Sequence, residues 1–193
     1  VYVDNTTPGD ANNAPIGSHV SYQITSKVPN YVGYNYYYFI MNDTLSNGLT
    51  FDGADSVAVK VGDTELTQGT DYYVYTENVS PKTFRLAFAD IMQYPVNDPI
   101  VVTYSATVND QAVIGTTGNP NTWTLQYSNN PDDTFGGNGR PDGQPGLPAE
   151  DSNVVLGETP EEKTLTYVTE LDITKYANDA LEEHLLGGAE FTL

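Results

Sequence analysis

The chain has 193 residues, no cysteine, and a formal net charge of −19 from 26 acidic and 7 basic side chains. This length is enough for one sizeable domain with its own hydrophobic core, and without cysteine there are no disulfides, thiolate metal sites or cysteine nucleophiles. The negative charge disfavours nucleic acids and anionic membranes as partners, and no apolar run approaches the roughly 20 residues of a membrane-spanning helix.

Apolar and polar residues alternate along most of the first 130 residues, as they do in half-buried β-strands. Turn residues such as Asn47-Gly48 and Asp98-Pro99 separate the alternating runs, and a short helical turn is indicated only at 89–94. The pattern predicts an all-β protein, an antiparallel β-sandwich of the immunoglobulin-like kind. In chain order, the predicted strands are 19–28, 37–43, 57–61, 84–88, 100–108 and 123–127.

The composition changes near residue 130. Residues 131–163 are rich in glycine, proline and acidic residues, which predicts a long surface loop. A strand is expected again from Thr164, with Leu171, Ile173 and Lys175 on one face, and 189–193 is predicted to be another. These closing strands either complete the first sandwich or begin a second domain.

Conventional catalytic sites are not indicated. The two histidines, His19 and His184, lie near no serine nucleophile motif, and no phosphate-binding loop is present. We therefore expect no enzyme activity and no cofactor, with calcium as the alternative. Calcium takes six to eight oxygen ligands, and the candidate side chains are Asp132, Asp133 and Asp142, together with Asn138. Their spacing does not match an EF-hand.

Strand parity indicates a buried polar cluster. Asn5, Asp43 and Asn129 each continue an apolar row at the end of a predicted strand. A buried polar group without a partner costs a few kcal/mol, so we expect the three side chains to meet one another or water. The cluster is either a set of hydrogen bonds in the core or a reactive site.

Six separate segments carry a family resemblance: Ile16–Thr25, Asn42–Leu49, Tyr104–Val108, Asn121–Pro131, Leu171–Lys175 and Leu186–Leu193. They resemble the second domain of sortase-assembled pilin backbone subunits of Gram-positive bacteria. The resemblance implies an immunoglobulin-like sandwich of the collagen-adhesin type over residues 1–170, and it implies that 171–193 are the first strands of a following, incomplete domain.

Domains of this family form an isopeptide bond between a lysine and an asparagine. A buried, neutral lysine attacks the amide while a protonated acid polarises its carbonyl. The resemblance implies Asp43 as the acid and Asn129 as the amide, with Asn5 where the lysine is expected. We therefore predict no such bond between residues 1 and 170. Lys175 is implied to be the isopeptide lysine of the following domain.

The resemblance further implies a structural role in a cell-surface pilus: a rigid bead that gives spacing for adhesion. Its implied partners are other pilin subunits joined by a sortase, and its implied location is the cell wall surface outside a Gram-positive bacterium. The alternative is an adhesin domain that binds a host protein or glycan through a tyrosine-rich surface. The tyrosines considered are Tyr31, Tyr34, Tyr36, Tyr37, Tyr38, Tyr72 and Tyr73.

Overall fold

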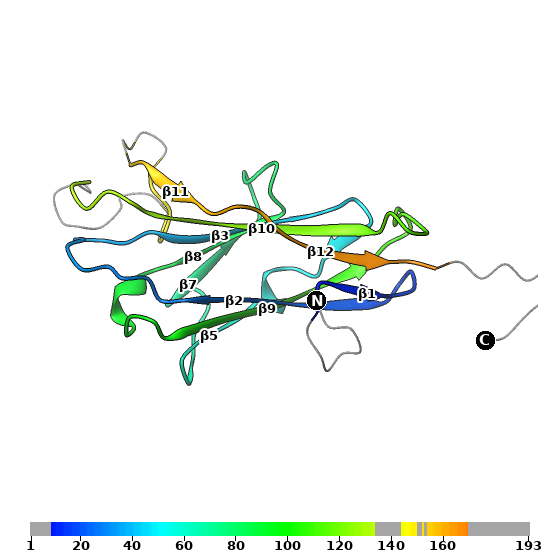
Figure 1. Cartoon of the computed structure of the whole chain (residues 1–193), viewed down its shortest axis with the longest axis horizontal. Coiled ribbons are helices and arrows are strands. Elements are labelled where there is room, and N and C mark those ends of the chain that lie inside the picture. Colours follow the sequence, from blue (N-terminus) through cyan, green and yellow to red (C-terminus); the bar gives the residue numbers. More distant parts are fainter. Residues whose placement is uncertain (1–8, 134–143, 150–151, 153, 170–193) are drawn as a thin grey trace, which may run out of the picture.

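A computed structural model describes residues 9–133, 144–149, 152 and 154–169. Two β-sheets pack face to face along the long axis of the molecule (Figure 1), which confirms the prediction of an all-β, immunoglobulin-like sandwich. Two single-turn 3₁₀ helices, η1 (Ala54–Ser56) and η2 (Ile91–Gln93), lie in loops. Neither helix in this described part of the chain has the length or apolarity to cross a bilayer.

The first sheet contains the chain's outermost described strands side by side. Its order is β1 (Ala11–Asn13), β12 (Glu162–Tyr167), β10 (Asn119–Ser128), β3 (Phe39–Leu45), β8 (Phe84–Phe88) and β7 (Tyr72–Tyr75). The short β11 (Leu156–Glu158) pairs with the far end of β10. All neighbours are antiparallel except β1 and β12, which run parallel.

The second sheet is built around the long strand β9. Its order is β2 (His19–Lys27), β9 (Pro99–Val108), β5 (Ala58–Val61) and β6 (Thr64–Glu65), and β4 (Leu49–Phe51) pairs with the other end of β9. The alternation predicted β2, β5, β8 and β9 to within two residues at each end. It missed β1, β4, β6 and β11, because runs of two or three residues are too short to show a period, and it missed β7 because the run Tyr-Tyr-Val-Tyr does not alternate.

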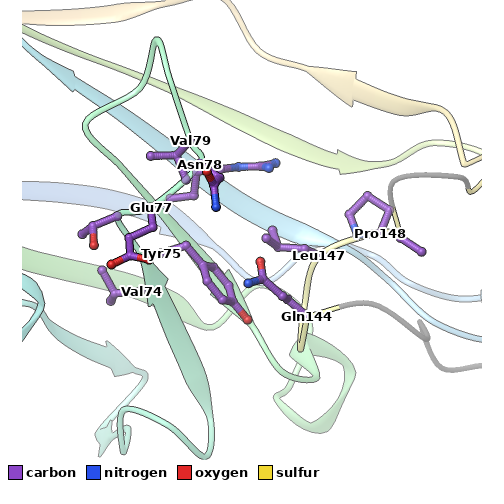
Figure 2. Close-up of a pocket in the computed structure, with 11 residues that line it drawn as sticks. Val74, Tyr75, Glu77, Asn78, Val79, Gln144, Leu147 and Pro148 are labelled. Atoms are coloured by element: carbon purple, nitrogen blue, oxygen red, sulfur yellow. The ribbon is translucent and has the colours of Figure 1, made fainter.

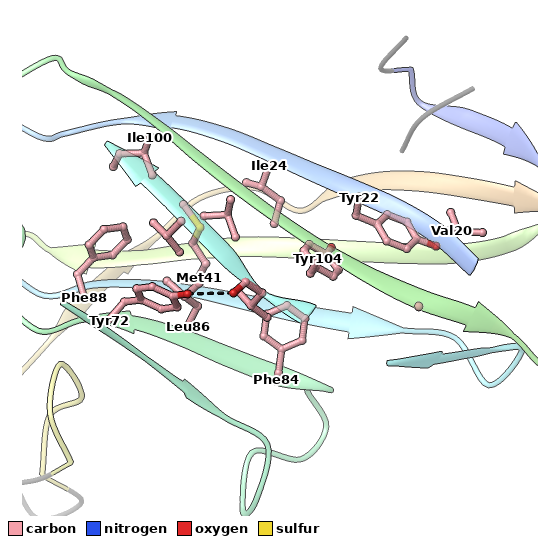
Figure 3. Close-up of a cluster of buried hydrophobic side chains, with 14 of the residues drawn as sticks. Val20, Tyr22, Ile24, Met41, Tyr72, Phe84, Leu86, Phe88, Ile100 and Tyr104 are labelled. Atoms are coloured by element: carbon pink, nitrogen blue, oxygen red, sulfur yellow. Dashed lines mark hydrogen bonds between the residues drawn. The ribbon is translucent and has the colours of Figure 1, made fainter. Parts of the chain in front are cut away.

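The hydrophobic core lies between the sheets (Figure 3). Val20, Tyr22 and Ile24 point inward from β2 and are buried against the facing sheet. The Tyr72 hydroxyl donates a 2.9 Å hydrogen bond to the carbonyl of Val57, and this bond ties β7 of the first sheet to the chain leading into β5. The predicted inward faces are therefore confirmed for the strands on which the core depends.

A second apolar cluster covers the outer face of β3 and β8, and it corrects the prediction for residues 131–163. Leu147 is buried against Tyr38, Ile40 and Ala87, and the hydroxyl of Tyr75 donates to the carbonyl of Pro145. The 131–163 range also contains β11 and the first residues of β12. The prediction of one solvated loop is wrong here because β3 is apolar on both faces, so its outer face needs a cover.

Candidate functional site

Asp43, Tyr104 and Asn121 form a hydrogen-bonded group inside the sandwich, which we call the Asp43 cluster. Asp43 lies on the core face of β3 and is fully buried. The Tyr104 hydroxyl, from β9 in the opposite sheet, donates a 2.5 Å hydrogen bond to Asp43 Oδ2. Asn121 Nδ2, from β10, donates a 2.6 Å bond to the same hydroxyl. The cluster therefore joins three strands and both sheets.

Aromatic rings surround the cluster. Tyr22 stacks on Tyr104 with 5.2 Å between ring centroids, and Phe84 meets Tyr104 edge to face at 5.1 Å. Figure 3 shows these rings side by side between the sheets. The hydroxyl of Tyr22 lies 3.4 Å from Thr166 Oγ1 on β12. The walls exclude water from Asp43, so its environment has a low dielectric constant.

The surroundings favour a protonated carboxyl on Asp43. Burial raises the pKa of Asp43 to about 7, although hydrogen bonds from Tyr104 and Asn121 and the charge of Lys82 act in the opposite direction. Burial, followed by the neighbouring charge of Asp43, raises the pKa of Tyr104 well above its ordinary value. At neutral pH the phenol is therefore neutral, and the Asp43 carboxyl keeps its proton to a much higher pH than an exposed aspartate does.

Two oxygens of the cluster have no hydrogen-bond partner. They are Asp43 Oδ1 and Asn121 Oδ1, and both are buried. An unpaired buried acceptor is costly, and a proton on the Asp43 carboxyl would turn one of these acceptors into a donor. The orphaned oxygens therefore support, independently of the pKa, a neutral Asp43.

Asp43 lies on the core face, as predicted, but the asparagine that joins its cluster is Asn121 and not the predicted Asn129. Asn129 is exposed and follows the last residue of β10, so the prediction that it points into the core is wrong. The residue of β10 opposite Asp43 is Trp123. At about 3.4 Å per residue, Asn129 lies some 20 Å farther along the strand.

The sequence contained the signal that identifies Asn121. β10 begins at Asn119, earlier than predicted, and Asn121 has the same parity as Trp123, Leu125 and Tyr127. Two antiparallel neighbours place the end of one strand beside the start of the other. Because Asp43 is near the end of β3, its amide neighbour must come from the start of β10.

Four of the other predicted site residues lie outside the described residues: Asn5, Asn138, Asp142 and Lys175. Asp132 is exposed, and Asp133 Oδ1 accepts a 2.6 Å hydrogen bond from Asn130 Nδ2. The described residues contain no group of three or more histidine, aspartate or glutamate side chains that could hold a metal.

The absence of a cofactor stays a prediction, with calcium binding by the acidic loop as its alternative. We expect added calcium to leave the melting temperature of the protein nearly unchanged, because Asp132 is exposed and Asp133 is already hydrogen-bonded to Asn130, and a ligand stabilises only where it binds the folded chain more tightly than the unfolded one. Thermal unfolding with and without calcium measures this. A rise of several degrees that is lost in an Asp132→Asn, Asp133→Asn variant would contradict it.

The Asp43 cluster has an acid and an amide but lacks a strong nucleophile among its described members. Lys27, Lys60 and Lys163 are exposed, and Lys82 is half-buried and acts on Asp43 through its charge. The group in contact with both Asp43 and Asn121 is the hydroxyl of Tyr104. A phenol with a raised pKa is a weak nucleophile, so this arrangement stabilises the core by hydrogen bonds.

A second polar group lies on the outer face of the other sheet, and no pattern in the sequence predicted it. Asp52 accepts hydrogen bonds from Ser105 Oγ (2.5 Å) and Thr107 Oγ1 (2.6 Å), and His19 Nδ1 lies 2.9 Å from its carboxylate. Burial acts to raise the pKa of Asp52, but these hydrogen bonds outweigh it and the pKa is lowered. Serine and histidine both contact the carboxylate, which is not the chain of contacts of a catalytic triad.

An open groove of about 600 Å³ lies beside β7 (Figure 2). Val74, Tyr75 and Glu77 form one side, and Gln144, Leu147 and Pro148 form the other. Arg85 also lines it and is fixed by hydrogen bonds to Asn42 Oδ1 and Gln126 Oε1. The groove thus separates β7 from the segment that covers β3 and β8.

The tyrosine-rich surface of the adhesin alternative does not form. Tyr36, Tyr37, Tyr38 and Tyr72 are buried, Tyr31 and Tyr34 pack partly against the core, and Tyr73 is half-buried and stacks on Tyr75. Their hydroxyls hold loops: that of Tyr31 donates to the carbonyl of Tyr94, and that of Tyr36 to the carbonyl of Ala89. These tyrosines brace the sandwich.

A protein-family comparison matches residues 16–131 to the family described as Gram-positive pilin backbone subunit 2, Cna-B-like domain. The match covers more than half of the chain and includes Asp43, Tyr104 and Asn121. A search of curated protein sequences found no significant match.

Solved structures of Gram-positive pilins share the fold. A three-domain backbone pilin of Streptococcus pyogenes is 24% identical, with a TM-score of 0.56 over 82% of this chain and 33% of that one. The major pilin of Bacillus cereus is 16% identical (TM-score 0.54, 81% and 36%). A C-terminal fragment of the major pilin of Streptococcus agalactiae is 19% identical (0.53, 82% and 52%). The chain thus spans a third to about half of these pilins.

Proposed function

Because this chain belongs to the family of Gram-positive pilin backbone subunits, as a Cna-B-like domain, we propose that it is a load-bearing spacer within a pilus. In this proposal its subunit is joined to other pilin subunits by a sortase and held at the cell wall surface. The chain acts mechanically and catalyses no reaction on another molecule.

The parallel pairing of β1 with β12 is the observation that carries the mechanical role. β1 is the first described strand and β12 is the last, and they are neighbours in one sheet (Figure 1). A pull on the two ends of the chain drives two parallel neighbours in opposite directions. Their hydrogen bonds, including Leu165 N–H to Asp10 O and Ala14 N–H to Tyr167 O, are then loaded together in shear instead of one by one.

The Asp43 cluster supports this role from the core. It links β3 and β10 of the sheet that contains β1 and β12 to β9 of the other sheet. The Tyr104 hydroxyl contacts both the Asp43 carboxyl and the Asn121 amide. We therefore propose that the domain resists force with hydrogen bonds and not with a lysine–asparagine bond.

Intact mass spectrometry tests the absence of the covalent bond. We expect the mass of the purified chain to equal the mass of its sequence, because the described part of the chain brings no lysine amine into contact with Asn121. A deficit of about 17 Da, which is one lost ammonia, would contradict the proposal.

Single-molecule force spectroscopy tests the load-bearing role. Tandem copies pulled through their chain ends should unfold at one shear-type force peak each. Every event should release the full stretch from β1 to β12, roughly 500 Å at 3.3–3.6 Å per residue. A much shorter release would indicate a covalent link, and gradual peeling without a force peak would contradict the shear arrangement.

A further inference from the structure

Three exposed large apolar side chains gather at one end of the sandwich, which we call the exit pole. Ile16 lies in the β1–β2 turn, and Val113 and Ile114 lie in the β9–β10 loop. Each has about half of its surface exposed. The other two exposed large apolar side chains of the described residues, Val32 and Val155, lie in loops at the opposite end (Figure 1).

The chain leaves the sandwich between the two loops of the exit pole. Val168 forms a parallel bridge with Ile114 and its carbonyl accepts a 2.8 Å hydrogen bond from Gly115 N–H. On the other side, Ala14 N–H donates to the carbonyl of Tyr167. The residues after Thr169 therefore start from the middle of the apolar patch.

The loop that presents Val113 and Ile114 is held in place from within. Asn119 is buried, and its side chain forms hydrogen bonds to both the N–H (2.8 Å) and the carbonyl (3.0 Å) of Val113. A third bond runs from Asn119 Nδ2 to the carbonyl of Thr166 on β12. The patch is thus displayed on a fixed backbone, and its exposure is not a result of loop fraying.

The composition of the remaining chain fits this patch. Residues 170–193 include Leu171 and Ile173, three and five positions after the buried Val168, but also six acidic side chains. At about 3.5 Å per residue, both apolar side chains start within some 18 Å of Val168. Asp110 is the one acidic residue of the two pole loops, so acidic chain can approach here with little repulsion on a protein of net charge −19.

We propose that the exit pole is the docking surface for the chain's own residues 170–193, with Leu171 and Ile173 covering Ile16, Val113 and Ile114. Such a contact would fix the direction in which the polypeptide continues beyond the sandwich. The proposal goes beyond the pilus role, because it requires neither polymerisation nor a sortase.

Hydrogen–deuterium exchange on the full 193-residue chain tests the docking. We expect Val113→Ser and Ile114→Ser to speed amide exchange in peptides covering 171–176 by roughly tenfold, because local protection depends on apolar contacts. The matched control is Val32→Ser, a valine at the opposite end that is 81% exposed, which should leave those peptides unchanged.

A reciprocal variant tests the same contact without changing any residue of the exit pole. Leu171→Ser changes no described residue, and it should speed exchange in peptides covering 109–118. Unchanged exchange at 171–176 in folded Val113→Ser protein would overturn the proposal. A concentration-dependent dimer in analytical ultracentrifugation that Val113→Ser abolishes would also overturn it, because a second copy would then cover the patch.

Discussion

Asp43→Asn should remove a large part of the pH dependence of folding stability. The folded-state pKa of Asp43 is raised to about 7 from an ordinary value of 3.8, so the folded chain binds a proton that the unfolded chain has lost between these pH values. The stability from this group is fully present below pH 4 and is lost as the pH rises to about 7. The loss levels off about one pH unit above the folded-state pKa of Asp43.

The size of the effect follows from the shift. Each pH unit in the window changes the free energy of unfolding by about 1.4 kcal/mol. The free energy of unfolding of the wild type, minus that of Asp43→Asn, should therefore fall by roughly 4 kcal/mol between pH 4 and pH 7. Urea unfolding at a series of pH values measures the difference.

Two variants sharpen this experiment. Tyr104→Phe keeps the ring but removes the hydroxyl that lowers the pKa of Asp43, so it should move the upper end of the window to higher pH. Asp52→Asn should show the opposite pH dependence, because the pKa of Asp52 is lowered in the fold. The loss of stability in this variant should be present at neutral pH and should disappear only on acidification below about pH 4. A difference between wild type and Asp43→Asn that does not vary with pH would show that Asp43 is ionised in the fold.

Gly48→Ala should be severely destabilising. A β-carbon on Gly48 would lie 2.3 Å from Asn119 Oδ1 and 2.5 Å from the Cα of Ala112. Asn119 cannot move without breaking its hydrogen bonds to Val113 and Thr166. We expect a loss of roughly 3–5 kcal/mol, which combines steric overlap with unpaired buried polar groups.

Gly53→Ala is the matched control for Gly48→Ala. Gly53 has a φ of +95° but nothing within 4 Å of the β-carbon position, so its substitution should cost only the backbone strain of about 1–2 kcal/mol. Equal losses in the two variants would mean that the β3–β4 turn shifts to accommodate the methyl group. Chemical denaturation of both variants measures the comparison.

The pattern of residues was enough to predict the class of fold. Alternation along 19–28, 84–88 and 100–108 matches β2, β8 and β9 because one face of each strand is buried and the other is not. The same alternation turned Asp43 toward the core. The predicted strand 123–127 extended its inward row forward to Asn129 and stopped short of Asn121, which lies on the same row inside β10.

Strand pairing decided the rest. The register of β3 with β10 places Asn121 near Asp43, and the packing of the two sheets places Tyr104 in contact with Asp43. Leu147 packs on the outer face of β3, from which it is more than 100 residues away in the sequence. These contacts join segments that are distant in the chain. A local period says which way a side chain points, but only the packing of sheets determines which other side chain it meets.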